Sequence, residues 1–428
     1  MLSKKKISYY MLLILMIYFC TKMLWDSITN DFTEYFSLLL IMSGFLMSIL
    51  RIRKKSIGLL CIFLVFSMYI IFNALFLTDI THLKRGIYEY IFYVSIYFAT
   101  IGFLKNISLK QLTKIFEILC YISLFLSILT LIEYIRRVAF ISTDGEIAYG
   151  TFISGYGYTF RCKVFTRSYL SHGMIMGILS LINLYMYRIN RKKKWLIFYI
   201  SCIVAILLTS SRGPLVATSI ATVYFMIDLE KLKRCKKSTL INSLLIGIGG
   251  LSFIYVLFGN DITFENNTIM YFVSRIRNIF NWSGDAGNLG RMHRWETYWN
   301  YFKSHNMLFG SGVSVTGTSG CTTLDMGTTE SGILKRLVEL GIVGTGLYYI
   351  FVSIAIYTPI KRLKSVKNEK IASLKKLSIA VLLSVLIDDC ILQITEEIMV
   401  SFYFWVFLAI LYYTTFYYIS LIEKESIN

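Results

Sequence analysis

The stretch WLIFYISCIVAILLTSSRGPLVATSIATVYFMIDL, residues 195–229, decides the fold class. It contains two apolar runs separated only by Ser210-Ser211-Arg212-Gly213-Pro214. A helix that crosses the hydrocarbon core of a bilayer needs about 20 predominantly apolar residues. Proline is tolerated in the first turn of a helix, where its missing N–H costs nothing. The stretch therefore predicts two transmembrane helices joined by a very tight turn.

Similar apolar runs fill most of the remaining chain. Of the 428 residues, 56% are hydrophobic and 16% are charged, whereas soluble domains average about 25% charged residues. The first run follows three lysines but precedes the bulky residues Thr21–Trp25, so we expect a retained helix and not a cleaved signal peptide. The sequence predicts an all-α polytopic membrane protein of about twelve transmembrane helices, near residues 7–25, 34–50, 56–77, 86–104, 115–135, 168–187, 195–210, 213–229, 239–258, 333–358, 377–394 and 398–421.

Basic residues give this topology an orientation. Loops on one side are rich in Lys and Arg, and cytoplasmic loops carry such an excess. Both termini are then cytoplasmic, and the net charge of +19 needs no nucleic acid to explain it. The basic loops are Lys4–Lys6, Arg51–Lys55, Lys105–Lys114, Arg188–Lys194, Lys231–Lys237 and Lys361–Lys376.

The topology divides the chain into three parts. Residues 1–258 hold helices one to nine, 259–332 form a large outer loop, and 333–428 hold helices ten to twelve. The loop contains an aromatic, helix-like run, Trp295–Phe302, and we expect it to form a helical cap over the membrane. Cys162 and Cys321 lie in two separate outer loops, but the sequence alone does not show whether they pair.

Arginine is enriched on the outer side, whereas lysine predominates on the cytoplasmic side. Topology requires only positive charge, while a guanidinium can grip phosphate through two parallel hydrogen bonds. The pattern favours an anionic ligand at the outer face over ordinary loop composition. Arg212 has two interpretations as well: a functional charge at membrane depth, or an interfacial side chain that reaches the lipid headgroups.

The large outer loop contributes further candidates. Arg291 and Arg294 are spaced to share one helical face, and the Gly-Ser-Gly segment Gly310–Gly312 allows a close backbone approach. Glu330, just before the tenth helix, is a candidate general base. Its alternative role is that of a helix-start carboxylate favoured by the helix dipole.

Three segments occur in an order that resembles the O-antigen ligase and polymerase superfamily of bacterial polysaccharide assembly. They are Ser211-Arg212-Gly213, the run from Arg291 through Trp295 to Leu308-Phe309-Gly310-Ser311-Gly312, and the segment Glu330–Gly341. Ligases of this family carry a histidine where this chain has Glu330. The departure favours the polymerase branch, whose members often carry an acidic residue there.

The resemblance implies a membrane-embedded glycosyltransferase fold of the GT-C-like type in the bacterial inner membrane. It implies a metal-independent enzyme without cofactors that polymerises undecaprenyl-diphosphate-linked oligosaccharide units into O-antigen or capsular polysaccharide. The lipid-linked unit would serve as donor and acceptor, with a chain-length regulator as protein partner. The alternatives are a ligase of the same superfamily and a lipid-linked oligosaccharide flippase, although flippases usually show repeated halves that this chain lacks.

The resemblance also suggests roles for individual residues. Arg212 and Arg291 would stabilise the diphosphate leaving group, and Glu330 would accept the proton of the acceptor hydroxyl. The runner-up bases are Asp388, Asp389, Glu396 and Glu397, although the favoured interpretation of this acidic group is a solvated hairpin that keeps positive charge away. No metal site is expected, because the four histidines lack ligand spacing. The expected substrate-binding residues are Arg85, Arg167, Arg294, Trp295, Gly310, Gly312 and Arg336.

Overall fold

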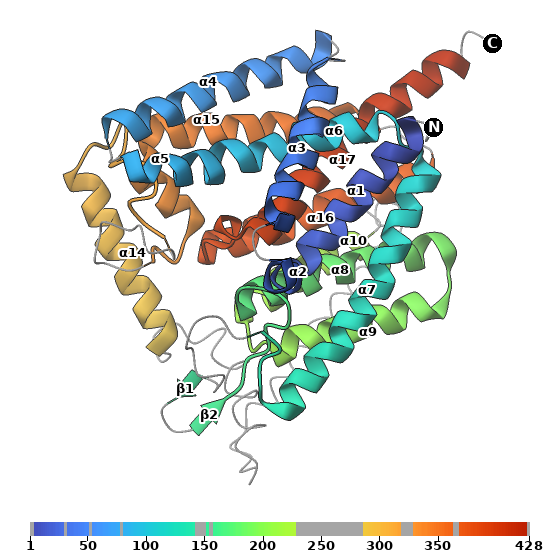
Figure 1. The fold of residues 1–428 in the computed structure, drawn as a ribbon, viewed down its shortest axis with the longest axis horizontal. Helices are drawn as coiled ribbons and strands as arrows, with labels where there is room; N and C mark the ends of the chain where they lie inside the picture. The colour runs from blue at the N-terminus through green and yellow to red at the C-terminus, as the bar shows by residue number, and fades with distance from the viewer. Residues whose placement is uncertain are drawn as a thin grey trace, which may run out of the picture.

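The computed structural model describes residues 4–29, 32–50, 54–77, 80–141, 151–153, 157–227, 286–317, 328–362 and 368–425. These residues are almost entirely helical (Figure 1). The exception is a short antiparallel hairpin formed by β1 (Thr151–Ile153) and β2 (Gly157–Thr159).

The helices follow the predicted apolar runs closely. Every predicted helix that falls on described residues is present, and the one predicted at 239–258 lies outside them. The first part of the chain forms α1 (Lys4–Cys20), α2 (Lys22–Thr29), α3 (Phe32–Ile49), α4 (Lys54–Phe76), α5 (Ile80–Gly86), the π-helical segment η1 (Ile87–Phe92), α6 (Tyr93–Leu104), α7 (Leu109–Arg136), α8 (Tyr169–Asn190), α9 (Lys193–Leu208) and α10 (Arg212–Met226). The remainder forms α14 (Ala286–Ser304), α15 (Gly332–Arg362), α16 (Glu369–Ile391), the 3-10 segment η3 (Ile394–Glu396) and α17 (Ile398–Glu425).

Two details differ from the sequence prediction. The first predicted helix, 7–25, is two helices, because the chain bends by 91° between α1 and α2. Among the described residues, seven helices are long and apolar enough to cross a membrane, or eight if the bent pair is one span. The helices α9 and α10 have only 16 and 15 residues, and α16 is charged at both ends. The structure is therefore that of a polytopic membrane protein, while the count of twelve stays a prediction.

Described residues at or beside several of the predicted basic loops contact one another, whereas the loop predicted at Lys231–Lys237 lies outside the described residues. Lys105 Nζ donates to the Ser48 carbonyl at 3.3 Å, and Asn106 Nδ2 donates to Ser8 Oγ at 3.0 Å. Lys376 Nζ donates to the Ile227 carbonyl at 2.9 Å. Both chain termini lie toward the same side of the molecule, away from α14 (Figure 1). This arrangement agrees with the alternation of the loops, and the cytoplasmic assignment of that end stays a prediction.

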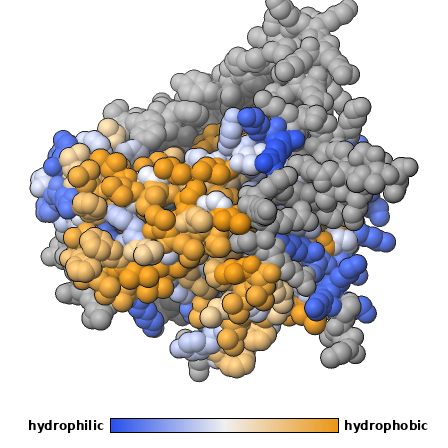
Figure 2. All heavy atoms as spheres, turned by 90° about the horizontal axis from the view of Figure 1, so that it is seen from above, coloured by the Kyte–Doolittle hydropathy of each residue, from blue (hydrophilic) through white to orange (hydrophobic). Residues whose placement is uncertain are grey.

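Burial separates central helices from peripheral ones. In α8 and α17, 89% of the apolar window is buried, against 22% in α3 and 33% in α4. Large apolar side chains are exposed along α3 and α4, for example Leu39, Met68 and Phe72. Figure 2 shows apolar residues gathered over one broad face with hydrophilic residues at its margins. Such a face suits contact with lipid, where apolar side chains lose nothing by exposure.

The helix α15 is broken at Gly341, which has φ 64° and ψ −170°. The segment Met307–Gly312 fills the break and pairs with it through backbone hydrogen bonds. These run from Ser311 N to Val338 O (2.8 Å), Gly312 N to Glu339 O (3.1 Å), Ile342 N to Met307 O (2.9 Å) and Val343 N to Leu308 O (3.1 Å). The break therefore leaves none of these groups unpaired, which is a requirement for irregular backbone at membrane depth.

Glycine is needed on both sides of this break. A Cβ on Gly310 (φ 79°) would collide with Glu339 O, and a Cβ on Gly341 would collide with Leu308 O. Asn73 of α4 supports the pairing, because its Oδ1 accepts from Val313 N at 2.8 Å and its Nδ2 donates to Phe309 O at 2.9 Å. The backbone that approaches Gly310 and Gly312 closely, as the sequence predicted, is therefore that of α15.

Candidate active site

Two arginines of α14 converge on Glu330, the residue that precedes the start of α15. Arg294 Nη1 lies 2.8 Å from Glu330 Oε1, and Arg291 Nε lies 3.3 Å from Glu330 Oε2. The side chains of Arg291, Arg294 and Glu330 are 24%, 45% and 22% exposed. We call these three residues the arginine cluster. It is open to solvent, so an external anion can reach the guanidinium groups.

The backbone of Glu330 is held in an unusual conformation. Its φ of 52° lies in the left-handed region, which few residues other than glycine adopt. Trp295 Nε1 donates to the Glu330 carbonyl at 2.9 Å and fixes this conformation from α14. Such conformations persist only where the surroundings determine them, and they often mark functional sites.

The Ser211-Arg212-Gly213 turn lies against the end of α16. A Cβ on Gly213 would collide with Asp388 Oδ1, so the carboxylate lies directly against the turn. The Asp388 carboxylate is also within electrostatic range of Arg291. The structure therefore brings together the turn, α14 and the acidic end of α16, which lie far apart in the sequence.

The neighbouring Asp389 is held by other groups. It accepts from Arg336 Nη1 at 2.8 Å, from Thr395 N at 3.1 Å and from Thr395 Oγ1 at 2.7 Å. Gly332, at the start of α15, packs against this carboxylate, and a Cβ there would collide with it. Asp389 thereby ties α15 to the connection between α16 and α17.

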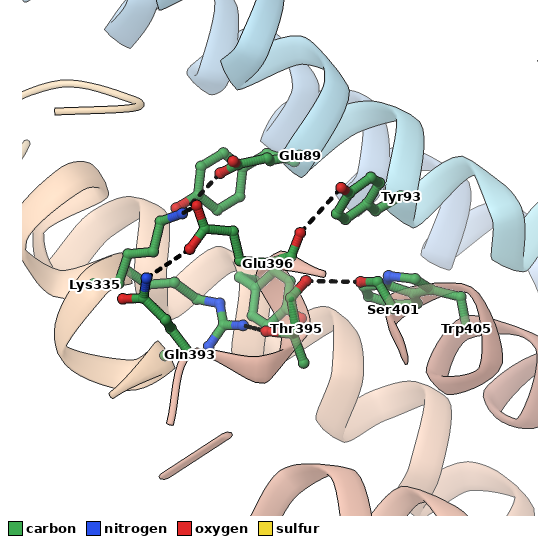
Figure 3. Close-up of a pocket in the computed structure, with 12 residues that line it drawn as sticks. Glu89, Tyr93, Lys335, Gln393, Thr395, Glu396, Ser401 and Trp405 are labelled. Atoms are coloured by element: carbon green, nitrogen blue, oxygen red, sulfur yellow. Dashed lines mark hydrogen bonds and ion pairs between the residues drawn. The ribbon is translucent and has the colours of Figure 1, made fainter. Parts of the chain in front are cut away.

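A second set of charges lies deeper, between η1, α15 and η3 (Figure 3). Lys335 Nζ lies 2.8 Å from Glu89 and 3.4 Å from Glu396, and Arg85 pairs with the same two carboxylates. Their side chains are at most 14% exposed. We call Arg85, Glu89, Lys335 and Glu396 the buried charge network. Opposite charges inside it offset one another and do not need a ligand.

Two residues predicted to bind substrate have internal partners. Arg85 belongs to the buried charge network. Arg336 is 5% exposed, donates to Asp389 and Thr395, and lies over the ring of Tyr348 at 4.5 Å. Substrate contact by either residue stays a prediction, and their described contacts are structural.

Glu339 and Glu397 are placed differently from Glu330. Glu339 is fully buried and accepts from Tyr90 and from Thr316. Glu397, just before α17, has its pKa raised to about 7 because burial disfavours its charge, an effect that the exposed Arg167 opposes. The four acidic residues after Ile387 do not form a solvated hairpin, since Asp388 and Asp389 are buried.

Sequence analysis missed Glu89 and Lys335. Both fall within runs predicted as transmembrane helices, where a charge is costly and indicates a partner. Arg85 and Glu89 are also spaced to pair on one helical face. These signals could have identified the network.

No group of three or more His, Cys, Asp or Glu side chains in the described part of the chain could hold a metal ion. Cys162 is a buried free thiol, and Cys321 lies outside the described residues.

Comparison with known families adds one finding. The model of the O-antigen ligase family matches residues 196–349, which include the Ser211–Gly213 turn, the arginine cluster and the break in α15. A search of curated proteins finds no match. The match covers about a third of the chain and supports a relationship to the O-antigen ligase and polymerase superfamily, whose members are membrane enzymes.

Proposed function

We propose that this protein polymerises oligosaccharide units carried on a polyprenyl diphosphate, at the outer face of the bacterial cytoplasmic membrane. The observation that carries the proposal is the convergence of Arg291 and Arg294 on the partly exposed carboxylate of Glu330, in a region that Asp388 links to the Ser211-Arg212-Gly213 turn. This arrangement suits a multiply charged leaving group. The family match to O-antigen ligases supports the substrate class.

In the proposed reaction, a hydroxyl oxygen of the acceptor glycan attacks the anomeric carbon of the donor. The bond from that carbon to the diphosphate breaks, and the diphosphate takes the electron pair. Preorganised arginines stabilise this developing charge. Arg212 and Arg291 are proposed to do so, with Arg294 and Arg167 as further substrate-binding residues.

An apolar cleft beside the arginine cluster fits the remaining parts of such a substrate. Trp295, Trp299, Leu334 and Leu337 line it, between α14 and the first part of α15. Aromatic and aliphatic side chains suit a prenyl chain or the apolar face of a sugar ring. The cleft and the cluster share α14, so a ligand with a charged and an apolar part could contact both.

The polymerase reading is preferred over the ligase because Glu330 stands where ligases of the family carry histidine. A deletion strain distinguishes the polymerase from the ligase and from a flippase. Loss of a polymerase leaves single repeat units on the surface, loss of a ligase leaves no attached glycan, and loss of a flippase leaves the units facing the cytoplasm. A ladder of chain lengths that persists in the deletion strain would contradict the proposal.

Complementation then tests the site. Arg212→Ala is expected to abolish the ladder at a normal protein level, because the substitution removes a charge that stabilises the leaving group. Arg188→Ala is the matched control, since Arg188 lies at the opposite end of the bundle near the Phe225 carbonyl. The control is expected to retain the ladder. A full ladder with Arg212→Ala would refute the role of Arg212.

A further inference from the structure

The adjacent carboxylates Asp388 and Asp389 differ in their surroundings. Asp389 accepts hydrogen bonds from Arg336 and Thr395. Asp388 is 0% exposed, and neither of its carboxylate oxygens has a hydrogen-bond partner among the described residues. Buried polar groups are almost always paired, so an unpaired carboxylate requires an explanation. Stability does not provide one, because a buried polar group without a hydrogen-bond partner destabilises a fold.

The position of Asp388 suggests a role in catalysis. Its Oδ1 lies against Gly213, whose lack of a side chain leaves only backbone between the carboxylate and the Arg212 turn. The charged groups that act on it most strongly are Asp389 of its own helix and Arg291 of the arginine cluster. Asp388 thus lies between the two segments that carry the proposed diphosphate-binding arginines.

Glu330, the base predicted from the sequence, is less available than Asp388 to accept a proton. Both of its carboxylate oxygens already accept hydrogen bonds from guanidinium groups, of Arg291 and Arg294. A carboxylate in this position is well placed to hold the two arginines together. The Asp388 carboxylate accepts no hydrogen bond from the described residues.

We propose that Asp388, and not Glu330, is the carboxylate that accepts the proton of the acceptor hydroxyl. The inference rests on the proposed function. As the hydroxyl oxygen bonds to the anomeric carbon, its proton passes to an Asp388 oxygen, and the diphosphate departs with the electron pair of the broken bond. Because Gly213 lies against Asp388 Oδ1, the proposal requires the Ser210–Gly213 turn to move aside and admit substrate. Ser210 already has φ 54° in this turn, an uncommon conformation for a residue other than glycine.

Adjacent substitutions provide a matched test in the deletion strain. Asp388→Asn keeps the shape of the side chain and breaks no hydrogen bond among the described residues, so its melting temperature is expected to stay close to that of the wild type. Its polymer yield is expected to fall at least ~100-fold, the usual contribution of a general base. Asp389→Asn breaks a buried ion pair, so it should lower the melting temperature and reduce polymer only in proportion to the folded protein.

The two readouts separate a catalytic role from a structural one. A normal ladder with Asp388→Asn, or a lowered melting temperature that accounts for the lost ladder, would overturn the inference. Glu330→Gln is the competing variant: if it abolishes polymer while Asp388→Asn does not, Glu330 is the base. A deletion strain that still polymerises would instead refute the proposed function, so the two failures are distinguishable.

Discussion

The arginine cluster and the buried charge network are built from similar ion pairs, and Glu330 and Lys335 are near neighbours in the chain. Their surroundings are different. Every side chain of the network is at most 14% exposed, and each charge contacts at least one opposite charge of the network. In the cluster, 24% of Arg291 and 45% of Arg294 are exposed. The comparison indicates that the network serves the fold, while the cluster is available to a ligand.

The first part of α15 connects the two regions. Glu330 precedes it, Lys335 lies within it, and the break at Gly341 ends it. A substitution in the network or at the break is therefore expected mainly to lower the stability of the fold. A substitution in the cluster is expected mainly to weaken the binding of substrate. The following substitutions test this separation, from the largest expected effect on stability to the smallest.

Lys335→Met is expected to have the largest effect. It removes a cation that pairs with both Glu89 and Glu396, and removing one member of a buried ion pair costs about 3–5 kcal/mol. A thermal melt of the purified protein measures the effect. Lys335→Met/Glu89→Gln, which restores the charge balance, should recover part of the loss. An unchanged melting temperature in Lys335→Met would show that the network does not stabilise the fold.

Gly341→Ala is expected to cost about 1–3 kcal/mol, because it combines an unfavourable positive φ with a backbone collision. Gly346→Ala is the control, since Gly346 lies on the same helix and a Cβ there would meet nothing within 4 Å. That change should be neutral or slightly stabilising. Equal melting temperatures for the two variants would contradict the role of Gly341 in the break.

These glycines also show how far the sequence could predict the structure. Helix positions followed from apolar runs, because the bilayer requires such runs of any spanning helix. The sequence also singled out Arg212, Arg291 and Glu330 as candidates; the structure pairs Arg291 with Glu330, and the roles of all three stay proposals. The break in α15 was not predictable, since it depends on pairing with Met307–Gly312 from a separate segment.

The buried carboxylates show the same limit. The sequence indicates that Asp388 and Asp389 are adjacent, but it cannot indicate that Thr395 and Arg336 pair with one and leave the other unpaired. The bend between α1 and α2 was also missed. Each of these features depends on contacts between distant residues, which the period of apolar residues does not encode.

Arg294→Ala should change stability by only about 0–1 kcal/mol, as is usual for exposed ion pairs. Polymer yield in the deletion strain should nevertheless fall, because the variant removes a guanidinium from the proposed diphosphate site. A thermal melt and a glycan gel on the same variant measure both effects. A large drop in melting temperature together with unchanged polymer would reverse the roles assigned to the cluster and the network.

A separate test, of pH dependence, concerns Glu397. Burial raises the pKa of its carboxyl from 4.5 to about 7, so the folded protein binds an extra proton between these values. Stability from this group is present below pH 4.5 and is lost as pH rises through about 7. Melting curves from pH 5 to 8 should show this slope in the wild type and a weaker slope in Glu397→Gln. Identical slopes would contradict the burial of Glu397.

The central claim is that the arginine cluster binds a lipid diphosphate, and a binding measurement tests it without knowledge of the sugars. Farnesyl diphosphate is a suitable probe for the purified protein in detergent. We expect Arg291→Ala to weaken its binding at least ~10-fold relative to the wild type, as expected for the loss of one charge-assisted phosphate contact. Farnesyl monophosphate should bind the wild type more weakly than the diphosphate. Equal affinity of wild type and Arg291→Ala for farnesyl diphosphate would contradict the claim.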